Sequence, residues 1–115
     1  MIDLPWPPTV NHYYTVAKGR KILSQSGRAF KLYATQLMQI QHIDRIKAPS
    51  YSVHILARPP DRRRRDLDNV LKPILDALTE YGAISDDSKI DDLRIQRLKP
   101  VKLGSIQISV TGIAK

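Results

Sequence analysis

Apolar side chains recur along the chain with the period of an α-helix in two segments. The first begins at Ser26 and is closed by Pro49, and the second precedes Gly82, a residue type that commonly ends helices. The spacing i, i+3, i+4, i+7 is followed in the first segment by Phe30, Tyr33, Ala34, Leu37, Met38 and Gln41, and in the second by Val70, Leu71, Ile74, Leu75, Leu78 and Tyr81. We therefore predict two amphipathic helices.

Pro73 restricts where the second helix begins. A proline deep inside a helix costs about 3 kcal/mol, whereas a proline in the first turn is tolerated. We therefore expect the helix to start near Asn69 or Val70. This places Asp66 and Asp68 on the turn just before it.

Alternating apolar and polar residues, bounded by proline or glycine, predict the strands. They cover residues 2–4, 51–57, 90–98 and 105–110, and residues 11–16 and 21–24 flank a turn with Gly19 as a small hairpin. Two helices among several short strands predict an α/β (α+β) fold. We expect one small domain over residues 1–115, with a mixed β-sheet of about four to five strands packed against the two helices.

The charge of the chain narrows the class of partner. Its 115 residues carry 19 Lys and Arg against 11 Asp and Glu, a formal charge of +8 and a pI near 10.0, which is typical of proteins that bind a polyanion. Residues 58–115 hold twelve of the basic residues and nine of the eleven acidic ones. Carboxylates would weaken phosphate binding by a surface that has no other role. Their concentration in residues 58–115 therefore indicates a catalytic role.

Several other classes are excluded by what the sequence lacks. No apolar run approaches the roughly 18 residues needed to span a bilayer, and the first residues lack the basic and apolar regions of a secretory signal. We expect a soluble, cytoplasmic protein without membrane contact. The absence of cysteine excludes disulfides and zinc ribbons, so a metal would bind oxygen or imidazole, and the three histidines have no ligand spacing.

The main candidate site is a basic run followed by two aspartates and a lysine. The run consists of Arg62, Arg63, Arg64 and Arg65, and it is followed by Asp66, Asp68 and Lys72. In an extended segment the two carboxylates point the same way, and their oxygens suit Mg²⁺ or Mn²⁺. Two such carboxylates and a nearby lysine are the smallest set of side chains needed for metal-assisted phosphodiester hydrolysis. The arginines would bind the phosphates.

A structural interpretation of the same residues is also open. Aspartates near a helix start are stabilised by about 0.3–1 kcal/mol each through the helix dipole, and Asp68 lies at helical spacing from Lys72. The arginines would then form a solvated loop with local salt bridges. Four consecutive like charges repel one another unless an anion is expected, which weighs against this interpretation.

Further acidic residues follow the second helix. Asp86 and Asp87 lie in a polar turn, and one of them would join the two earlier aspartates if the next strand brought it back beside the helix start. Without such a neighbour, a pair of adjacent aspartates usually only stabilises a turn. Asp91 and Asp92 alternate with apolar residues, which favours an exposed strand face.

Aromatic and basic residues near the N-terminus form a second candidate surface. Tyr13 and Tyr14 could flank or stack on nucleic acid. They share their segment with three basic residues, Lys18, Arg20 and Lys21. Trp6, between prolines, is interpreted instead as a packing anchor for the first strand.

Three blocks of sequence distributed over nearly the whole chain carry a family resemblance, both in their residues and in the spacing between them. They are Leu4-Pro5-Trp6-Pro7-Pro8-Thr9-x-Asn11-x-Tyr13-Tyr14, then Pro60-Asp61-Arg62-Arg63-Arg64-Arg65-Asp66-Leu67-Asp68-Asn69-x-x-Lys72-x-x-x-Asp76-Ala77-Leu78, and then Asp86-Asp87. Together they resemble the RusA family of Holliday junction resolvases, which are phage-derived endodeoxyribonucleases. The second block is the specific one, because chance agreement over so many fixed positions is rare.

The resemblance implies a Mg²⁺-dependent homodimer, with Mn²⁺ as a substitute, that binds four-way DNA junctions and resolves them by paired nicks in recombination and DNA repair. It implies that Asp66, Asp68 and Asp87 are catalytic and hold the metal, with Asp86 as a further candidate ligand, and that Lys72 is the catalytic lysine. An important basic position falls on Arg65. The DNA-binding residues expected on this basis and from the charge pattern are Arg62, Arg63, Arg64, Arg65, Lys18, Arg20, Lys21 and Tyr14.

The dimer has its own physical argument. A four-way junction has approximate two-fold symmetry, so two paired cuts need two sites related by a two-fold axis, which a C₂ dimer provides. The candidate interfaces are an exposed strand at residues 105–110 and the helix that contains Tyr33 and Leu37.

Two other functions stay open at this point. A non-catalytic basic DNA-binding module would need no Mg²⁺ and would tolerate changes of Asp66 or Asp68. A metal-dependent nuclease that acts on another nucleic acid, such as RNA, would keep the carboxylates and change only the substrate.

Overall fold

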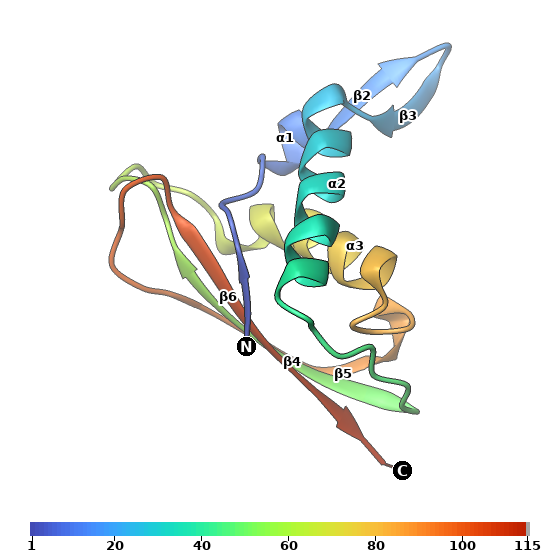
Figure 1. Ribbon diagram of the computed structural model, residues 1–115. Helices are drawn as coiled ribbons and strands as arrows, with labels where there is room; N and C mark the ends of the chain where they lie inside the picture. The colour runs from blue at the N-terminus through green and yellow to red at the C-terminus, as the bar shows by residue number, and fades with distance from the viewer. Residues whose placement is uncertain (115) are drawn as a thin grey trace.

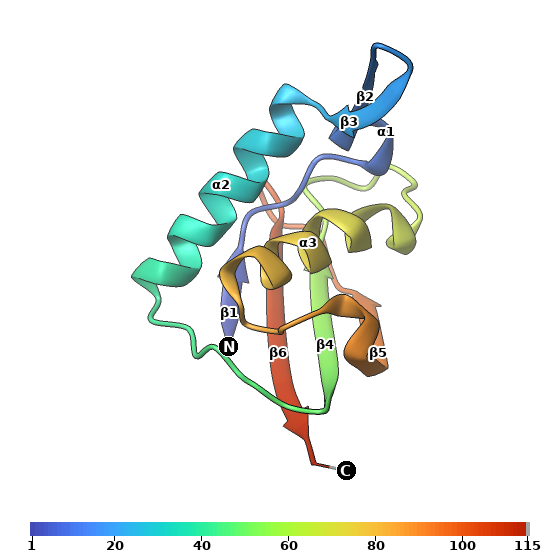
Figure 2. The ribbon, with the colours of Figure 1, turned by 90° about the vertical axis from the view of Figure 1, so that its right-hand side faces the viewer.

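The helices of the protein cover one face of a mixed four-stranded sheet in the computed structural model (Figures 1 and 2), which describes residues 1–114. Lys115, the last residue of the expected domain, lies outside the described residues. The strand order is β1-β6-β4-β5, with bounds β1 Ile2–Leu4, β4 Ser50–Arg58, β5 Ile90–Arg97 and β6 Ser105–Ile113. Only β4 and β5 are parallel. The predicted α+β architecture with a mixed sheet is confirmed.

The first predicted helix is α2, Gln25–Ile40. Its N-cap is Ser24, whose side chain accepts a hydrogen bond from the Gly27 backbone N–H at 3.0 Å and so satisfies one of the helix's free donors. The buried face consists of Gly27, Phe30, Ala34 and Met38. Tyr33 was expected on that face, but its side chain is on the outer side of the helix and is 53% exposed.

The second predicted helix is α3, Leu71–Tyr81, which follows a 3₁₀ turn, η1, at Leu67–Val70. It ends at Gly82, whose φ of 98° lies in the left-handed region that glycine adopts without strain. Pro73 is the third residue of α3, where its missing N–H has no helical acceptor to lose, so the expected start of the helix is confirmed.

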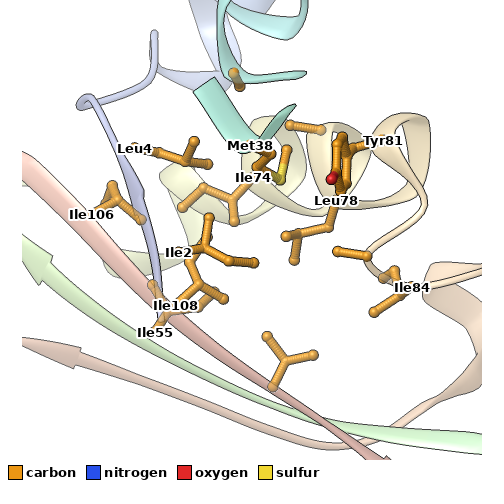
Figure 3. Close-up of a cluster of buried hydrophobic side chains, with 14 of the residues drawn as sticks. Ile2, Leu4, Met38, Ile55, Ile74, Leu78, Tyr81, Ile84, Ile106 and Ile108 are labelled. Carbon is orange, nitrogen blue, oxygen red and sulfur yellow. The ribbon is translucent and has the colours of Figure 1, made fainter. Parts of the chain in front are cut away.

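The core lies between the sheet and the two long helices (Figure 3). Ile55 of β4 pairs with Ile108 of β6 in the centre of the sheet, and both are fully buried. Ile74 and Leu78, four residues apart on α3, cover them from above. Burial of each such side chain contributes about 1.5–3 kcal/mol, which fixes α3 over the sheet.

A separate two-stranded hairpin extends beyond the helices (Figure 1). It consists of β2, Tyr14–Ala17, and β3, Arg20–Leu23, and follows a single helical turn, α1, at Val10–Tyr13. The prediction of a strand over residues 11–13 was therefore wrong. The Thr9 carbonyl accepts the Tyr13 N–H at 2.8 Å and closes a turn too short for its period to be recognised.

One expected dimer surface lies on an inner strand of the sheet. β6 lies between β1 and β4, and its residues Ile106 and Ile108 are buried, whereas Ser105, Gln107, Ser109 and Val110 are partly exposed. The use of this strand as a dimer interface stays a prediction. Among residues 1–114, no helix has the length and apolar character needed to cross a membrane.

Candidate active site

The segment between β4 and α3 presents two acidic side chains that have no partner within the described residues 1–114. Asp66 occupies the N-cap position of η1 in an extended conformation, and Asp68 lies within the turn. Within residues 1–114 neither carboxylate accepts a hydrogen bond or forms an ion pair, and Asp66 does not cap the turn. Because the 3₁₀ turn already includes Asp68, the expectation that both side chains point the same way in an extended segment does not apply.

Lys72, one turn further on, is paired with an acid that the sequence analysis did not select. Its Nζ lies 2.8 Å from Asp76 Oδ1, and the other carboxylate oxygen of Asp76 accepts the Tyr13 hydroxyl at 2.8 Å. The hydrogen bond with Asp76 is the main cause that raises the pKa of Lys72, and the nearby negative charge of Asp87 adds to it. The alternative in which Lys72 pairs with Asp68 is therefore wrong.

A cleft of about 400 Å³ joins the hairpin to α3. It is lined by Tyr14, Lys21, Ile22, Leu23, Lys31, Lys72, Asp76, Thr79, Glu80 and Asp87. In Figure 2 the chain after α3 runs back past the helix to the 3₁₀ turn η2, Asp87–Lys89, whose Asp87 is one of these lining residues. The fold thereby brings together four of the expected residues: Tyr14, Lys21, Lys72 and Asp87. Asp66 and Asp68 are not part of this lining.

Two tyrosines at the base of the hairpin differ in what they can contact. Tyr14 is partly exposed, and the Lys21 ammonium lies 4.3 Å from the centre of its ring. Tyr13 is fully buried, so the expectation that it could stack on nucleic acid was wrong. Lys18 and Arg20 are exposed at the hairpin turn, outside the cleft lining.

The two aspartates at the start of η2, Asp86 and Asp87, make different contacts. Asp86 is the N-cap, and its Oδ1 accepts the Ser88 backbone N–H at 2.9 Å, which lowers the pKa of Asp86. Asp87 lines the cleft near Lys72. On β5, Asp92 accepts the Ser52 hydroxyl at 2.9 Å and is exposed, as the alternation predicted.

The four arginines before Asp66 are not equivalent. Arg65 donates to Asp61 at 2.6 Å and is only 19% exposed, whereas Arg63 is 83% exposed and its Nε lies 3.6 Å from the same carboxylate. The hydrogen bond from Arg65 is the main cause that lowers the pKa of Asp61 to about 2. The Arg97 guanidinium donates to the Arg65 carbonyl. Arg62 and Arg64 are exposed. The run therefore contains one arginine held by an ion pair, Arg65, and others that are accessible to an anion.

Comparison with known proteins places this arrangement in a family. The model of the family "Endodeoxyribonuclease RusA" matches residues 5–111. The chain is 37% identical over 110 residues to the crossover junction endodeoxyribonuclease RusA of Shigella sonnei, a match that covers 96% of this chain and 92% of the relative. The proteins of the same name from Escherichia coli K12 and Enterobacteria phage 82 are each 36% identical, with the same coverage. The chain belongs to the RusA family of endodeoxyribonucleases.

The acidic side chains of this RusA-family chain can be compared with the ligands that a divalent metal ion requires. Within the described residues 1–114, no three acidic or histidine side chains gather closely enough to hold one ion. Mg²⁺ nevertheless often binds through one or two carboxylates and completes its shell with water and substrate phosphate. Asp66 and Asp68 are exposed, unpaired oxygen donors that fit this pattern. The three-carboxylate set with Asp87, and Asp86 as a ligand, stay predictions.

Two acidic residues that bind basic residues of the candidate site received no role from the sequence. Asp61 and Asp76 each lie four residues from a basic residue that they bind, Arg65 and Lys72 respectively. Both were quoted in the motif without a role. The spacing was a usable signal for Asp76, because it falls within a predicted helix.

Proposed function

We propose that this RusA-family protein is a Mg²⁺-dependent endodeoxyribonuclease that binds four-way DNA junctions in the cytoplasm and resolves them by paired nicks. The observation that carries the proposal is the pair of exposed, unpaired carboxylates, Asp66 and Asp68, one turn before the Lys72 ammonium. Exposed carboxylate oxygens that accept no hydrogen bond and form no ion pair within residues 1–114 are available to bind a divalent cation. The names of the relatives supply the substrate class.

Asp66 and Asp68 would hold the metal, with Asp87 approaching from η2. When bound, Mg²⁺ supplies Lewis-acid stabilisation of phosphoryl oxygens and lowers the pKa of a water nucleophile. Lys72 then offsets negative charge that grows on the phosphate, because its ammonium lines the cleft and Asp76 keeps it protonated.

The basic residues around the cleft would guide DNA to these groups. Lys21 and Lys31 line it, and Arg62 and Arg64 are exposed in the loop before Asp66. Tyr14 presents part of its ring at the cleft and is a platform on which a base or sugar can pack. The contacts of the basic residues with phosphate are electrostatic and independent of base identity, as expected for binding that reads the shape of a branched substrate.

The proposal includes a homodimer, since symmetric cuts need two sites related by a two-fold axis. The outer face of α2 is the candidate interface, because Leu32, Tyr33 and Ile40 are exposed there. A Tyr33→Glu variant is expected to sediment as a monomer and to bind a junction more weakly. A dimer that is unaffected would move the interface elsewhere.

A single assay tests the nuclease proposal. The protein is incubated with a synthetic four-way junction, a linear duplex of the same arm sequence and an RNA strand, each with Mg²⁺ or with EDTA. We expect paired nicks in the junction alone and only with Mg²⁺. Binding without cleavage under all conditions would favour a non-catalytic DNA-binding module, and cleavage of RNA or linear duplex would assign another substrate.

A further inference from the structure

Tyr13 is a buried side chain whose only polar atom is directed at the edge of the cleft. Its ring is fully buried, and its hydroxyl donates to Asp76 Oδ2 at 2.8 Å. A buried phenol requires such an acceptor, because an unpaired hydroxyl loses its bonds to water. The direction of the Asp76 carboxylate is therefore fixed by a group in the protein interior.

The other oxygen of Asp76 reaches Lys72. Oδ1 lies 2.8 Å from Nζ, and exposure rises from 20% for the Asp76 side chain to 45% for Lys72. A lysine ammonium has three donors on a flexible four-carbon stem. With one donor directed at Asp76, the remaining two are available to an anion in the cleft.

Tyr13 is itself held by α2. Its carbonyl accepts the Ser24 backbone N–H at 2.9 Å and the Ser24 hydroxyl at 3.1 Å. A Cβ at Gly27 would lie 2.4 Å from that carbonyl oxygen, so only glycine permits this approach of α1 to α2. A continuous set of contacts thus runs from α2 through Tyr13 to the carboxylate on α3.

We propose that Asp76, anchored by Tyr13, is a positioning residue that directs the Lys72 ammonium into the cleft toward the phosphate of the scissile strand. This inference rests on the proposed nuclease function. An ion pair that only stabilised α3 would need no buried partner from another element. The Tyr13 hydroxyl instead ties the orientation of the pair to the packing of α1 against α2.

The test is a kinetic cycle on the intact protein. Asp76→Asn is expected to lower kcat for junction nicking about 10- to 100-fold and to change KM less than about threefold, since binding is retained while the ammonium is misdirected. Tyr13→Phe is expected to give a smaller loss of kcat, and Asp76→Glu to restore part of the loss. Asp92→Asn, whose carboxylate also accepts a hydrogen bond but does not line the cleft, is the matched control and is expected to nick at the wild-type rate.

The same substitutions in a Lys72→Ala background separate positioning from stability. If Asp76 acts through Lys72, Asp76→Asn lowers kcat no further once Lys72 is gone. An equal loss in both backgrounds, or an unchanged kcat in Asp76→Asn, overturns the proposal.

Amine acylation followed by mass spectrometry gives a readout independent of nicking. The hydrogen bond to Asp76 should slow acylation of Lys72 relative to the exposed Lys47, and Asp76→Asn should raise the relative rate several-fold. If the wild-type protein nicks no junction but Lys72 is still protected, the nuclease proposal fails while the Asp76–Lys72 contact stands. Equal acylation in both proteins removes the basis for positioning.

Discussion

The loop of residues 61–65 and the 3₁₀ turn that follows it carry charges of the same kinds and use them differently. In the loop, Asp61 accepts hydrogen bonds from the Arg65 guanidinium and from the Arg63 backbone N–H. In the turn, the carboxylates of Asp66 and Asp68 have no partner within the part of the chain that the structure describes. The carboxylate of the loop therefore has hydrogen-bond partners within the protein, whereas the two carboxylates of the adjacent turn have none among the described residues.

The difference shows which charges belong to the scaffold and which are open to an external ligand. Asp61 and Arg65 hold the loop against itself, and the Arg97 guanidinium adds a contact to the Arg65 carbonyl. Fixing this loop also fixes the backbone at Asp66. Under the proposed function, the paired carboxylate of Asp61 would support the geometry of the site, and the carboxylates of Asp66 and Asp68 would be the ones open to a metal ion.

The largest effect is expected at the unpaired turn. Asp68→Asn should lower the rate of junction nicking by at least about 100-fold, because it weakens metal binding where charge develops. Junction affinity should be retained or increased, since a negative charge near phosphate is removed. The free energy of unfolding should change by less than about 0.5 kcal/mol, as for an exposed side chain without partners.

Nicking rate, junction affinity and thermal unfolding are measured on the same preparation of Asp68→Asn, with Asp92→Asn as the control. Wild-type nicking by Asp68→Asn would remove Asp68 from the metal site. A large loss of stability would show instead that the turn needs this carboxylate for folding.

The paired loop should respond in the opposite way. Asp61→Asn removes the negative charge that pairs with Arg65 and leaves only a neutral acceptor, so the loop should open more often and trypsin should cleave after Arg62–Arg65 several-fold faster. Nicking should fall less than in Asp68→Asn, because no reacting group is lost. The cleavage sites are identified by mass spectrometry, and unchanged proteolysis would mean that the Asp61–Arg65 pair does not order the loop.

Long periodic segments explain why much of the fold was predictable. The apolar spacing located the starts of α2 and α3 within a residue or two, and alternation located β4, β5 and β6. The end of α2 at Ile40 lies well before Pro49, which was predicted to close that segment. The single turn of α1 was not distinguishable from a strand, and the interior position of β6 depends on pairing with residues remote in sequence. Long periodic runs were predicted correctly, and the short strand β1 was also predicted at its observed bounds.

The types of residue in the candidate site were predictable from the sequence. Which acidic residue pairs with Lys72 was not. Lys72 lies four residues from both Asp68 and Asp76, so the sequence offers two helical partners. The α-helix begins only at Leu71, and Asp68 lies in a 3₁₀ turn with about three residues per turn, where the i, i+4 relation does not hold. The choice of Asp76 follows from this change of period and from Tyr13, which is remote in sequence.

A smaller effect distinguishes the arginines of the loop. Arg62 is exposed and has no ion-pair partner among residues 1–114, so Arg62→Gln should reduce the slope of log affinity against log salt by about one. Arg65→Gln should reduce it by less, because the charge of Arg65 is already balanced by Asp61. Junction binding at several salt concentrations measures both slopes, and equal reductions would contradict the division into paired and open arginines.

The smallest effect is the titration of Asp61 itself. The hydrogen bond from Arg65 holds the pKa of Asp61 at about 2, below its ordinary value of 3.8. A depressed pKa in the folded state means that the contact stabilises the fold fully above the ordinary value and that this contribution is lost as the pH falls toward the folded pKa. In Arg65→Gln the pKa should rise toward about 3.9. Carboxyl ¹³C shifts of Asp61 followed from pH 6 to pH 1.5 would measure this, and coincident curves would show that Arg65 leaves Asp61 unpaired in solution.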